Sequence, residues 1–180
     1  MGQYKTHDYQ SVDQQYVIFT LVKETMGVPI QCVKEVINLN SHALSRIPGS
    51  PSYFIGVINL RGLVVPLVDA RKKFNFGLSE AAAENPKAII LQNQKDIFGL
   101  VVDDVEEVVS IDESLIEGTP ANLSISGKDR KIGRISGKNS HGKDNRFVFL
   151  LSKDSIFEDY SDYLNLNMTK SRPSGQKTAV

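Results

Sequence analysis

An internal repeat constrains the fold of this chain more than any other feature of its sequence. The segment Gly27–Ile37 aligns without gaps on Gly99–Val109, and a glycine, a valine and a Glu-Val pair recur at matching positions. Further pairs follow in the same order: Tyr16–Val22 with Ala88–Gln94, Ile55–Ile58 with Ile132–Ile135, and Val64–Asp69 with Phe147–Ser152. Several matches in one order indicate that a supersecondary unit was duplicated.

Short apolar runs rich in Val, Ile and Phe predict that the repeated unit is built from strands. Gly, Pro, Asn and Asp separate the runs, which is typical of a mainly β protein. The runs are Tyr16–Val22, Val28–Ile30, Val33–Leu39, Phe54–Leu60, Leu63–Val68, Ala88–Gln92, Ile97–Val102, Val105–Ile111, Ile132–Ile135 and Phe147–Leu151. About five short strands in each half close most easily into a small barrel, because closure removes exposed sheet edges.

We therefore predict two similar five-stranded β-barrels of the SH3 or OB type within one folded unit at 14–164. Barrel 1 is expected at about 14–76 and barrel 2 at about 86–151, with an apolar seam between them. The pattern leaves open whether the barrels exchange a strand. The ends, 1–13 and 165–180, show no apolar period and are expected to be flexible tails.

Two helical segments are predicted directly after strands. Ser152 can cap a C-terminal helix over 152–164, in which apolar residues recur on one face. Asp69 is expected to cap a short helical turn at Ala70–Phe74 in the same way.

Composition excludes several classes of protein. The 180 residues carry 21 basic and 21 acidic side chains, whereas a general nucleic-acid binder normally has a basic excess. No apolar run approaches the length of a membrane span and the first twelve residues are polar, so we expect neither a membrane segment nor a secretion signal. One cysteine allows no intramolecular disulfide and fits a reducing cytoplasm.

No residue pattern predicts an active site, so we expect no enzymatic activity, no metal and no cofactor. The histidines His7, His42 and His141 are far apart and lack metal-ligand spacing. Cys32 has neither a basic neighbour nor an electropositive turn, which a thiol nucleophile would need. The Gly-x-Ser-Gly and Gly-x-Cys-Gly strings of two-barrel proteases, which build an oxyanion hole, do not occur.

Two further segments resemble sites without meeting their requirements. Gly137–Lys143 comes near to the phosphate loop G-x-x-x-x-G-K-[ST], but Asp144 follows the lysine and a strand follows the loop, so we predict a flexible hairpin loop. The carboxylates within Asp103–Glu107 alternate between the two faces of a strand, which favours solvated or partner-facing side chains over a metal site.

The segment Ile47–Asp69 is the least ordinary part of the chain. Two prolines stiffen its start, and Gly56 removes a side chain inside a strand, which often marks the close approach of another backbone. Arg61-Gly62 predicts a turn between two apolar strands. By its pattern alone, Arg61 is an ordinary turn arginine.

The motifs of this segment resemble the signature of CheW-type chemotaxis coupling proteins. The matching strings are Pro48-x-x-Pro51, Gly56-Val-Ile-Asn-Leu-Arg-Gly62, Val65-Pro-Leu-Val-Asp69, Val33-Lys-Glu-Val36 and Gly99-Leu-Val-Val-Asp-Asp-Val105. The resemblance extends from about Tyr16 to Phe157. It implies two five-stranded barrels, in agreement with the repeat.

The resemblance also implies a function. Proteins of this kind are adaptors that link the cytoplasmic tip of transmembrane chemoreceptors, the methyl-accepting chemotaxis proteins, to the histidine kinase CheA by binding its regulatory domain. It implies a cytoplasmic protein that is recruited to receptor clusters at the inner face of the membrane, without membrane insertion or nucleic-acid binding. Positions implicated in receptor and kinase coupling correspond to Val33, Glu35, Gly56 and Arg61.

We expect the receptor tip, a helical hairpin, to bind an apolar groove at the seam between the barrels. The residues predicted to line this groove are Val36, Phe54, Ile58 and Leu60. Gly56 is expected to permit close approach of a receptor helix.

Two alternatives remain open from the sequence. One is a CheW-like adaptor of a related, non-flagellar signalling pathway such as pilus-based motility. The other is an OB-like barrel that binds single-stranded nucleic acid, which would need a basic groove with exposed aromatic residues. We expect a stand-alone adaptor, not a coupling domain fused to a receiver or a kinase. The sequence does not determine which receptors it serves or its oligomeric state.

Overall fold

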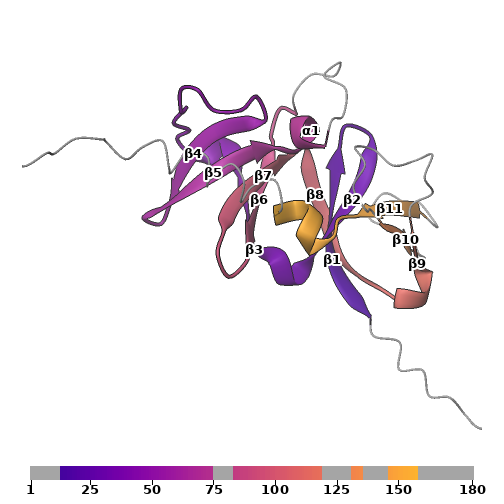
Figure 1. Ribbon diagram of the computed structural model, residues 1–180. Helices are drawn as coiled ribbons and strands as arrows, with labels where there is room; N and C mark the ends of the chain where they lie inside the picture. Colours follow the sequence, from indigo (N-terminus) through magenta and orange to yellow (C-terminus); the bar gives the residue numbers. More distant parts are fainter. Residues whose placement is uncertain (1–12, 75–82, 119–130, 136–145, 158–180) are drawn as a thin grey trace, which may run out of the picture.

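Two β-sheets account for most of the described residues (Figure 1). The structure is a computed structural model that describes residues 13–74, 83–118, 131–135 and 146–157. The first sheet has the order β8 (Asp104–Ile111), β1 (Gln14–Leu21), β2 (Glu24–Pro29), β11 (Arg146–Leu150), β10 (Lys131–Ile135) and β9 (Ile116–Gly118). The second has the order β3 (Val33–Asn38), β6 (Lys87–Gln92), β7 (Ile97–Val102), β5 (Leu63–Asp69) and β4 (Phe54–Leu60). The predicted mainly β fold is confirmed, although the short β9 gives the first sheet a sixth strand.

The two halves of the sequence exchange strands. β1 and β2, from the first half, pair with β8 and β11 from the second. In the same way β6 and β7, from the second half, pair with β3 and β5 from the first. The exchange that the sequence left open is therefore present, and a division into barrels at 14–76 and 86–151 does not describe the sheets. Duplicated strands offer equivalent edges to each other, so local sequence does not determine which copy pairs with which.

The repeated glycines show that the two sheets are related by the duplication. Gly27 on β2 lies opposite Leu150 of the parallel strand β11, and Gly99 on β7 lies opposite Leu67 of the parallel strand β5. A Cβ atom at Gly27 would come 2.9 Å from Leu150 Cδ2, and one at Gly99 would overlap Leu67 Cδ2. Both glycines therefore make room for the leucine of a neighbouring parallel strand.

One hydrophobic cluster joins the sheets. Phe19 and Met26, from the first sheet, pack in the same buried cluster as Ile89 and Phe98 from the second. Phe157 belongs to this cluster too, with its ring 5.4 Å from that of Phe98 in an edge-to-face arrangement. Because the two halves of the sequence exchange strands and the sheets share a core, we expect the sheets to unfold together.

Both predicted helix caps are confirmed. The side chain of Asp69 accepts hydrogen bonds from the backbone N–H groups of Arg71 and Lys72 at the start of α1 (Ala70–Lys73). Ser152 Oγ accepts one from Ser155 N, 3.1 Å away, and helix is present at 153–157. The rest of the predicted helix over 152–164 lies outside the described residues.

Short 3-10 turns lie at three strand junctions: η1 (Ile30–Cys32) between β2 and β3, η2 (Leu39–Ser41) after β3, and η3 (Glu113–Leu115) before β9. The crossing from β7 to β8 is made at Asp103, whose carboxylate is held by Arg71 of α1 and by the backbone N–H of Val22. This carboxylate therefore connects the β1–β2 turn of the first sheet to α1, which follows the second.

Candidate functional site

Arg61 and Gly62 form the tight turn of the β4–β5 hairpin. Leu60 pairs with Leu63, so these two residues make the whole loop, and their φ angles are 53° and 88°. Positive φ at both central residues is the requirement of a type I′ turn, whose twist matches that of the strands it joins. Asn59 Oδ1 accepts a hydrogen bond of 2.7 Å from Gly62 N. The predicted turn is confirmed, and it leaves the Arg61 side chain 81% exposed.

Glu35 of β3 forms an ion pair with Arg61. The Oε2 to Nη2 distance is 3.2 Å, and the Glu35 side chain is 22% exposed. β3 and β4 are opposite edges of the five-stranded sheet, so this contact shows that the sheet curls until its edges approach, as in a small barrel. Exposed pairs of this kind contribute only about 0–1 kcal/mol to stability. The ion pair therefore contributes little to the stability of the fold. Its main effect is to hold the charged, accessible Arg61 side chain in a defined position.

Gly56 has a structural partner within the chain. Its φ is 153°, and a Cβ atom there would overlap the carbonyl oxygen of Ser45 and approach Leu44 Cδ1 to 3.1 Å. Ser45 and Val57 exchange backbone hydrogen bonds of 2.9 and 2.8 Å beside it. The close backbone approach predicted for Gly56 is confirmed, but the approaching backbone is the chain's own. The space that was expected to receive a receptor helix is already filled.

The predicted groove lining is wrong for three of its residues. Phe54, Ile58 and Leu60 are 7%, 1% and 7% exposed and belong to the hydrophobic core. They alternate along β4 with more exposed neighbours, so they share the inward face of that strand. Val36 is 41% exposed on β3 and remains available to a partner.

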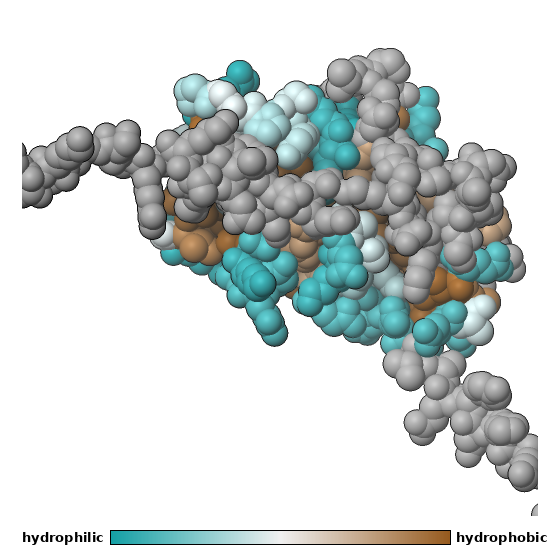
Figure 2. Space-filling model, in the orientation of Figure 1, coloured by the Kyte–Doolittle hydropathy of each residue, from teal (hydrophilic) through white to brown (hydrophobic). Residues whose placement is uncertain are grey.

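The hairpin that carries Arg61 also exposes apolar surface. Leu63 and Val64, at the start of β5, are 43% and 61% exposed. Figure 2 shows apolar surface gathered at the end of the molecule where β4 and β5 meet in Figure 1. An exposed arginine beside apolar side chains is a typical composition for the centre of a protein–protein interface.

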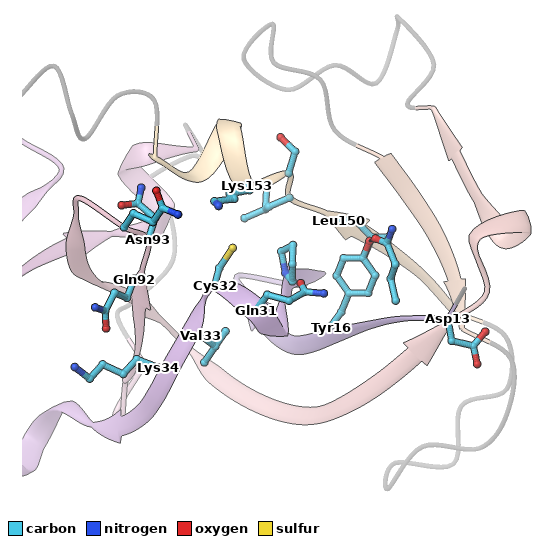
Figure 3. A pocket seen from close by; sticks show the side chains of 15 residues that line it. Asp13, Tyr16, Gln31, Cys32, Val33, Lys34, Gln92, Asn93, Leu150 and Lys153 are labelled. Atoms are coloured by element: carbon cyan, nitrogen blue, oxygen red, sulfur yellow. The ribbon is translucent and has the colours of Figure 1, made fainter. Parts of the chain in front are cut away.

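An open pocket of about 890 Å³ lies at the seam between the two sheets (Figure 3). Both sheets contribute to its wall: β1 and β11 from the first, β3 and β6 from the second, with η1 and the turn at 152–153 between them. The residues that line it are Asp13, Gln14, Tyr16, Pro29, Gln31, Cys32, Val33, Lys34, Gln92, Asn93, Gln94, Leu150, Leu151, Ser152 and Lys153. Of the predicted coupling residues, Val33 lies in this wall, whereas Glu35, Gly56 and Arg61 do not.

Two groups on the pocket wall, Tyr16 and Cys32, have pKa values shifted in favour of their neutral forms. Burial raises the pKa of the Tyr16 phenol, and the Glu113 carboxylate raises it further. The Tyr16 hydroxyl donates a 2.8 Å hydrogen bond to Gln14 Oε1. Burial also raises the pKa of the Cys32 thiol, against the opposing effect of the Lys153 ammonium group. A buried thiol with a raised pKa is a poor nucleophile, so this wall suits recognition better than covalent chemistry.

Within the part of the chain that the structure describes, the other segments considered from the sequence supply no catalytic group to this site. Among the described residues, no three His, Cys, Asp or Glu side chains gather closely enough to hold a metal ion. His42 is half-buried, with Nδ1 3.1 Å from the carbonyl oxygen of Asn38, while His7, His141 and the Gly137–Lys143 loop lie outside the described residues. Within the described ranges, no helix is long and apolar enough to cross a membrane.

The acidic segment is divided between different roles. Asp103 forms an ion pair with Arg71 inside the fold, so the prediction of a solvated or partner-facing carboxylate is wrong at this position. Glu106 accepts a 2.6 Å hydrogen bond from Thr20 Oγ1 on the neighbouring strand, and Asp104 is exposed.

Comparison with known proteins agrees with this geometry. A family model described as the CheW-like domain matches residues 15–161. The chain belongs to the CheW-like domain family. It is 37% identical to the chemotaxis protein CheW of Klebsiella aerogenes over 112 residues, which are 62% of this chain and 65% of that protein. It is 31% identical to the Bacillus subtilis chemotaxis protein CheW over 65% of this chain and 70% of the relative.

A solved structure shows the same architecture. The crystal structure of the scaffolding protein TtCheW from Thermoanaerobacter tengcongensis is similar with a TM-score of 0.67 and 28% identity, over 82% of this chain and 94% of that one. The CheW-like fold therefore accounts for the two curled sheets described here. The matched residues 15–161 include the exposed hairpin at Arg61 and nearly all of the seam pocket.

Proposed function

We propose that this protein is a non-enzymatic chemotaxis adaptor that couples transmembrane chemoreceptors to the histidine kinase CheA. Membership of the CheW-like family supports this function. The observation that carries it is the exposed Arg61 at the tip of the β4–β5 hairpin, paired with Glu35 and flanked by exposed Leu63 and Val64. This surface has the composition of an interface, and the described residues offer no catalytic constellation beside it.

The hairpin surface binds the kinase in this proposal. Arg61 contributes a planar donor group that can form two parallel hydrogen bonds with a carboxylate, and Val64 contributes apolar contact area. The partner is the regulatory domain of CheA. Gly56 acts indirectly, because it lets Ser45 pack against β4 and so holds the start of this hairpin in place.

The seam pocket binds the receptor tip. Helical partners bind in grooves by placing one face of the helix against a concave surface, and the pocket wall includes apolar side chains such as Val33 and Leu151. This replaces the predicted groove of Phe54, Ile58 and Leu60, whose side chains are in the core. Through its two surfaces the adaptor is recruited to receptor clusters at the inner face of the membrane.

A reconstituted assay tests this function. The protein is mixed with membranes that hold a chemoreceptor of the same organism and with its CheA, and kinase autophosphorylation is measured with and without the adaptor. We expect receptor-dependent activation that requires the adaptor, and no ATP hydrolysis by the adaptor alone. Failure of the wild-type chain to bind either partner would refute the proposal.

Charge reversal at Arg61 tests the surface that carries the proposal. Arg61→Glu places like charge beside Glu35 and against the acidic group of the partner, so we expect loss of most kinase activation. Because the Arg61 side chain is 81% exposed, the melting temperature of the Arg61→Glu variant should stay within a few degrees of that of the wild type. The double variant Glu35→Arg with Arg61→Glu restores the internal pair only. If it also restores activation, the pair has a structural role and Arg61 does not contact the kinase.

A further inference from the structure

The seam pocket has an uneven distribution of charge. Lys34 of β3 and Lys153 line its wall and lie on opposite sides of Cys32 in Figure 3. Asp13 is the only carboxylate in the lining, and it lies beyond Tyr16, away from both lysines. The pocket therefore has a cationic end and a weakly anionic end.

The two lysines have no carboxylate partner within the described part of the chain. Arg61 pairs with Glu35, Arg71 with Asp103 and Lys72 with Asp69, whereas neither Lys34 nor Lys153 takes part in an ion pair among the described residues. Lys153 is close enough to Cys32 to oppose the rise in the thiol pKa caused by burial. Its ammonium group therefore acts on the interior of the pocket as well as on its rim.

Neutral amide donors also line the pocket. Gln31, Gln92 and Gln94 are exposed and line the pocket, and a side-chain amide can donate to a carboxylate. Asn93 is different, because its Oδ1 already accepts from the backbone N–H groups of Lys95 and Asp96. The amides of Gln31, Gln92 and Gln94 are therefore the neutral donors that the pocket wall offers.

The pocket is large enough for part of a helix. A helix about 10 Å wide that rises about 5.4 Å per turn occupies roughly 420 Å³ per turn, so the pocket volume of about 890 Å³ is comparable to that of two turns. Two turns present one or two side chains to each end of the pocket. A single acidic side chain on the buried face can therefore reach the cationic end.

We propose that Lys34 and Lys153 determine specificity at this pocket by selecting a receptor-tip helix that carries an acidic side chain on its buried face. This rests on the proposed function, since it takes the receptor tip as the occupant. The acidic side chain lies between the two ammonium groups, and the glutamine amides bind its remaining oxygen lone pairs. Asp13 disfavours the reverse orientation of the helix, because that would place the acidic side chain beside a like charge.

Charge reversal tests the proposal. Lys34→Glu, Lys153→Glu and the double variant are compared with Lys87→Glu, a lysine at the far end of β6 from Gln92. The probe is a soluble receptor-tip fragment of the same organism, and its affinity is measured by calorimetry at low and high salt. We expect each single variant to bind several-fold more weakly and the double variant at least tenfold more weakly, with Lys87→Glu unchanged. The salt dependence should reverse in the double variant, because charge reversal replaces a screened attraction by a screened repulsion.

A reciprocal exchange identifies the partner group. Each acidic residue of the fragment is replaced in turn by lysine, and we expect one such fragment to bind Lys34→Glu more tightly than it binds the wild type. Binding of CheA to all variants should be unchanged. Wild-type affinity of the folded double variant for the receptor fragment would overturn this proposal while leaving the adaptor function intact. Absence of receptor binding by the wild type would instead count against the adaptor function itself.

Discussion

Removal of the Asp103 carboxylate should destabilise the whole fold, although Asp103 begins an acidic segment that the sequence predicts to be solvated or to face a partner. Its Oδ1 accepts from Arg71 Nε at 3.0 Å and from Nη2 at 2.6 Å, and its Oδ2 accepts from Val22 N at 2.6 Å. The Arg71 and Asp103 side chains are 15% and 18% exposed. One carboxylate therefore satisfies donors from α1 and from the β1–β2 turn at the crossing between the sheets.

The expected cost follows from the three hydrogen bonds. Breaking a buried ion pair by removing one partner costs about 3–5 kcal/mol, and the residual exposure of this pair favours the lower end, about 3 kcal/mol. For a domain of this size, 1 kcal/mol shifts the melting temperature by about 2–4 °C, so Asp103→Ala should melt about 6–12 °C lower. Asp103→Asn keeps one acceptor oxygen and should lose about 2 kcal/mol.

Urea unfolding measures this difference directly. We expect the urea midpoint of Asp103→Ala to be lower than that of the wild type, with the same dependence of the unfolding free energy on urea concentration. The slope should not change because unfolding exposes the same additional surface in both proteins. The neighbouring variant Asp104→Asn is a matched control, since Asp104 is exposed and its carboxylate accepts only a hydrogen bond from Val105 N within the described contacts. It should stay within about 0.5 kcal/mol of the wild type. If Asp103→Ala behaves like Asp104→Asn, the carboxylate does not hold the crossing and the reasoning fails.

Three further predictions concern backbone strain and burial. Val22 has a φ of 64°, which is costly for a β-branched residue, so Val22→Gly should raise the free energy of unfolding by about 0.5–1 kcal/mol; an unchanged urea midpoint would contradict this. Gly56→Ala should cost about 2–3 kcal/mol because its Cβ overlaps the Ser45 carbonyl, whereas Gly49→Ala, at φ 75° with nothing nearby, should cost about 1 kcal/mol. Because Cys32 is buried and burial raises the pKa of its thiol, the native thiol should react with Ellman's reagent far more slowly than the thiol of the urea-unfolded protein. The free energy of unfolding should also fall as the pH rises above about 8.5, where the thiol of the unfolded chain ionises. Equal reaction rates in the native and unfolded protein would contradict the burial of Cys32.

Local signals in the sequence were sufficient for the elements of the fold. Alternating apolar runs predicted the strands, and Asp69 and Ser152 were identified as caps because a cap depends on residues two or three positions away. The glycine at position 56 predicted close backbone approach, and Arg61-Gly62 predicted the hairpin turn. Each of these features depends on neighbours in the chain.

Features that depend on distant residues could not be predicted in the same way. β1 and β2 pair with strands of the second half of the sequence, and β6 and β7 pair with strands of the first half. Local sequence does not distinguish between the two duplicated copies of a strand as pairing partners. The Arg71–Asp103 pair joins residues 32 positions apart, and no motif signals it. The groove residues on β4 were assigned to the surface because their apolar character fits a groove as well as a core. Only the sheet geometry shows that Ile58 and Leu60 face inward.

Strand β3 connects the two surfaces on which the proposed function depends. Val33 and Lys34 line the seam pocket, and the next residue, Glu35, forms the ion pair with Arg61 at the hairpin. β3 is an edge strand that pairs only with β6 within the described sheets, and its register shifts between Val33 and Glu35. A strand held on one side, with an irregularity between two functional residues, can move more easily than a central strand. The proposed contacts at the pocket and at the hairpin are therefore joined through consecutive residues of one edge strand.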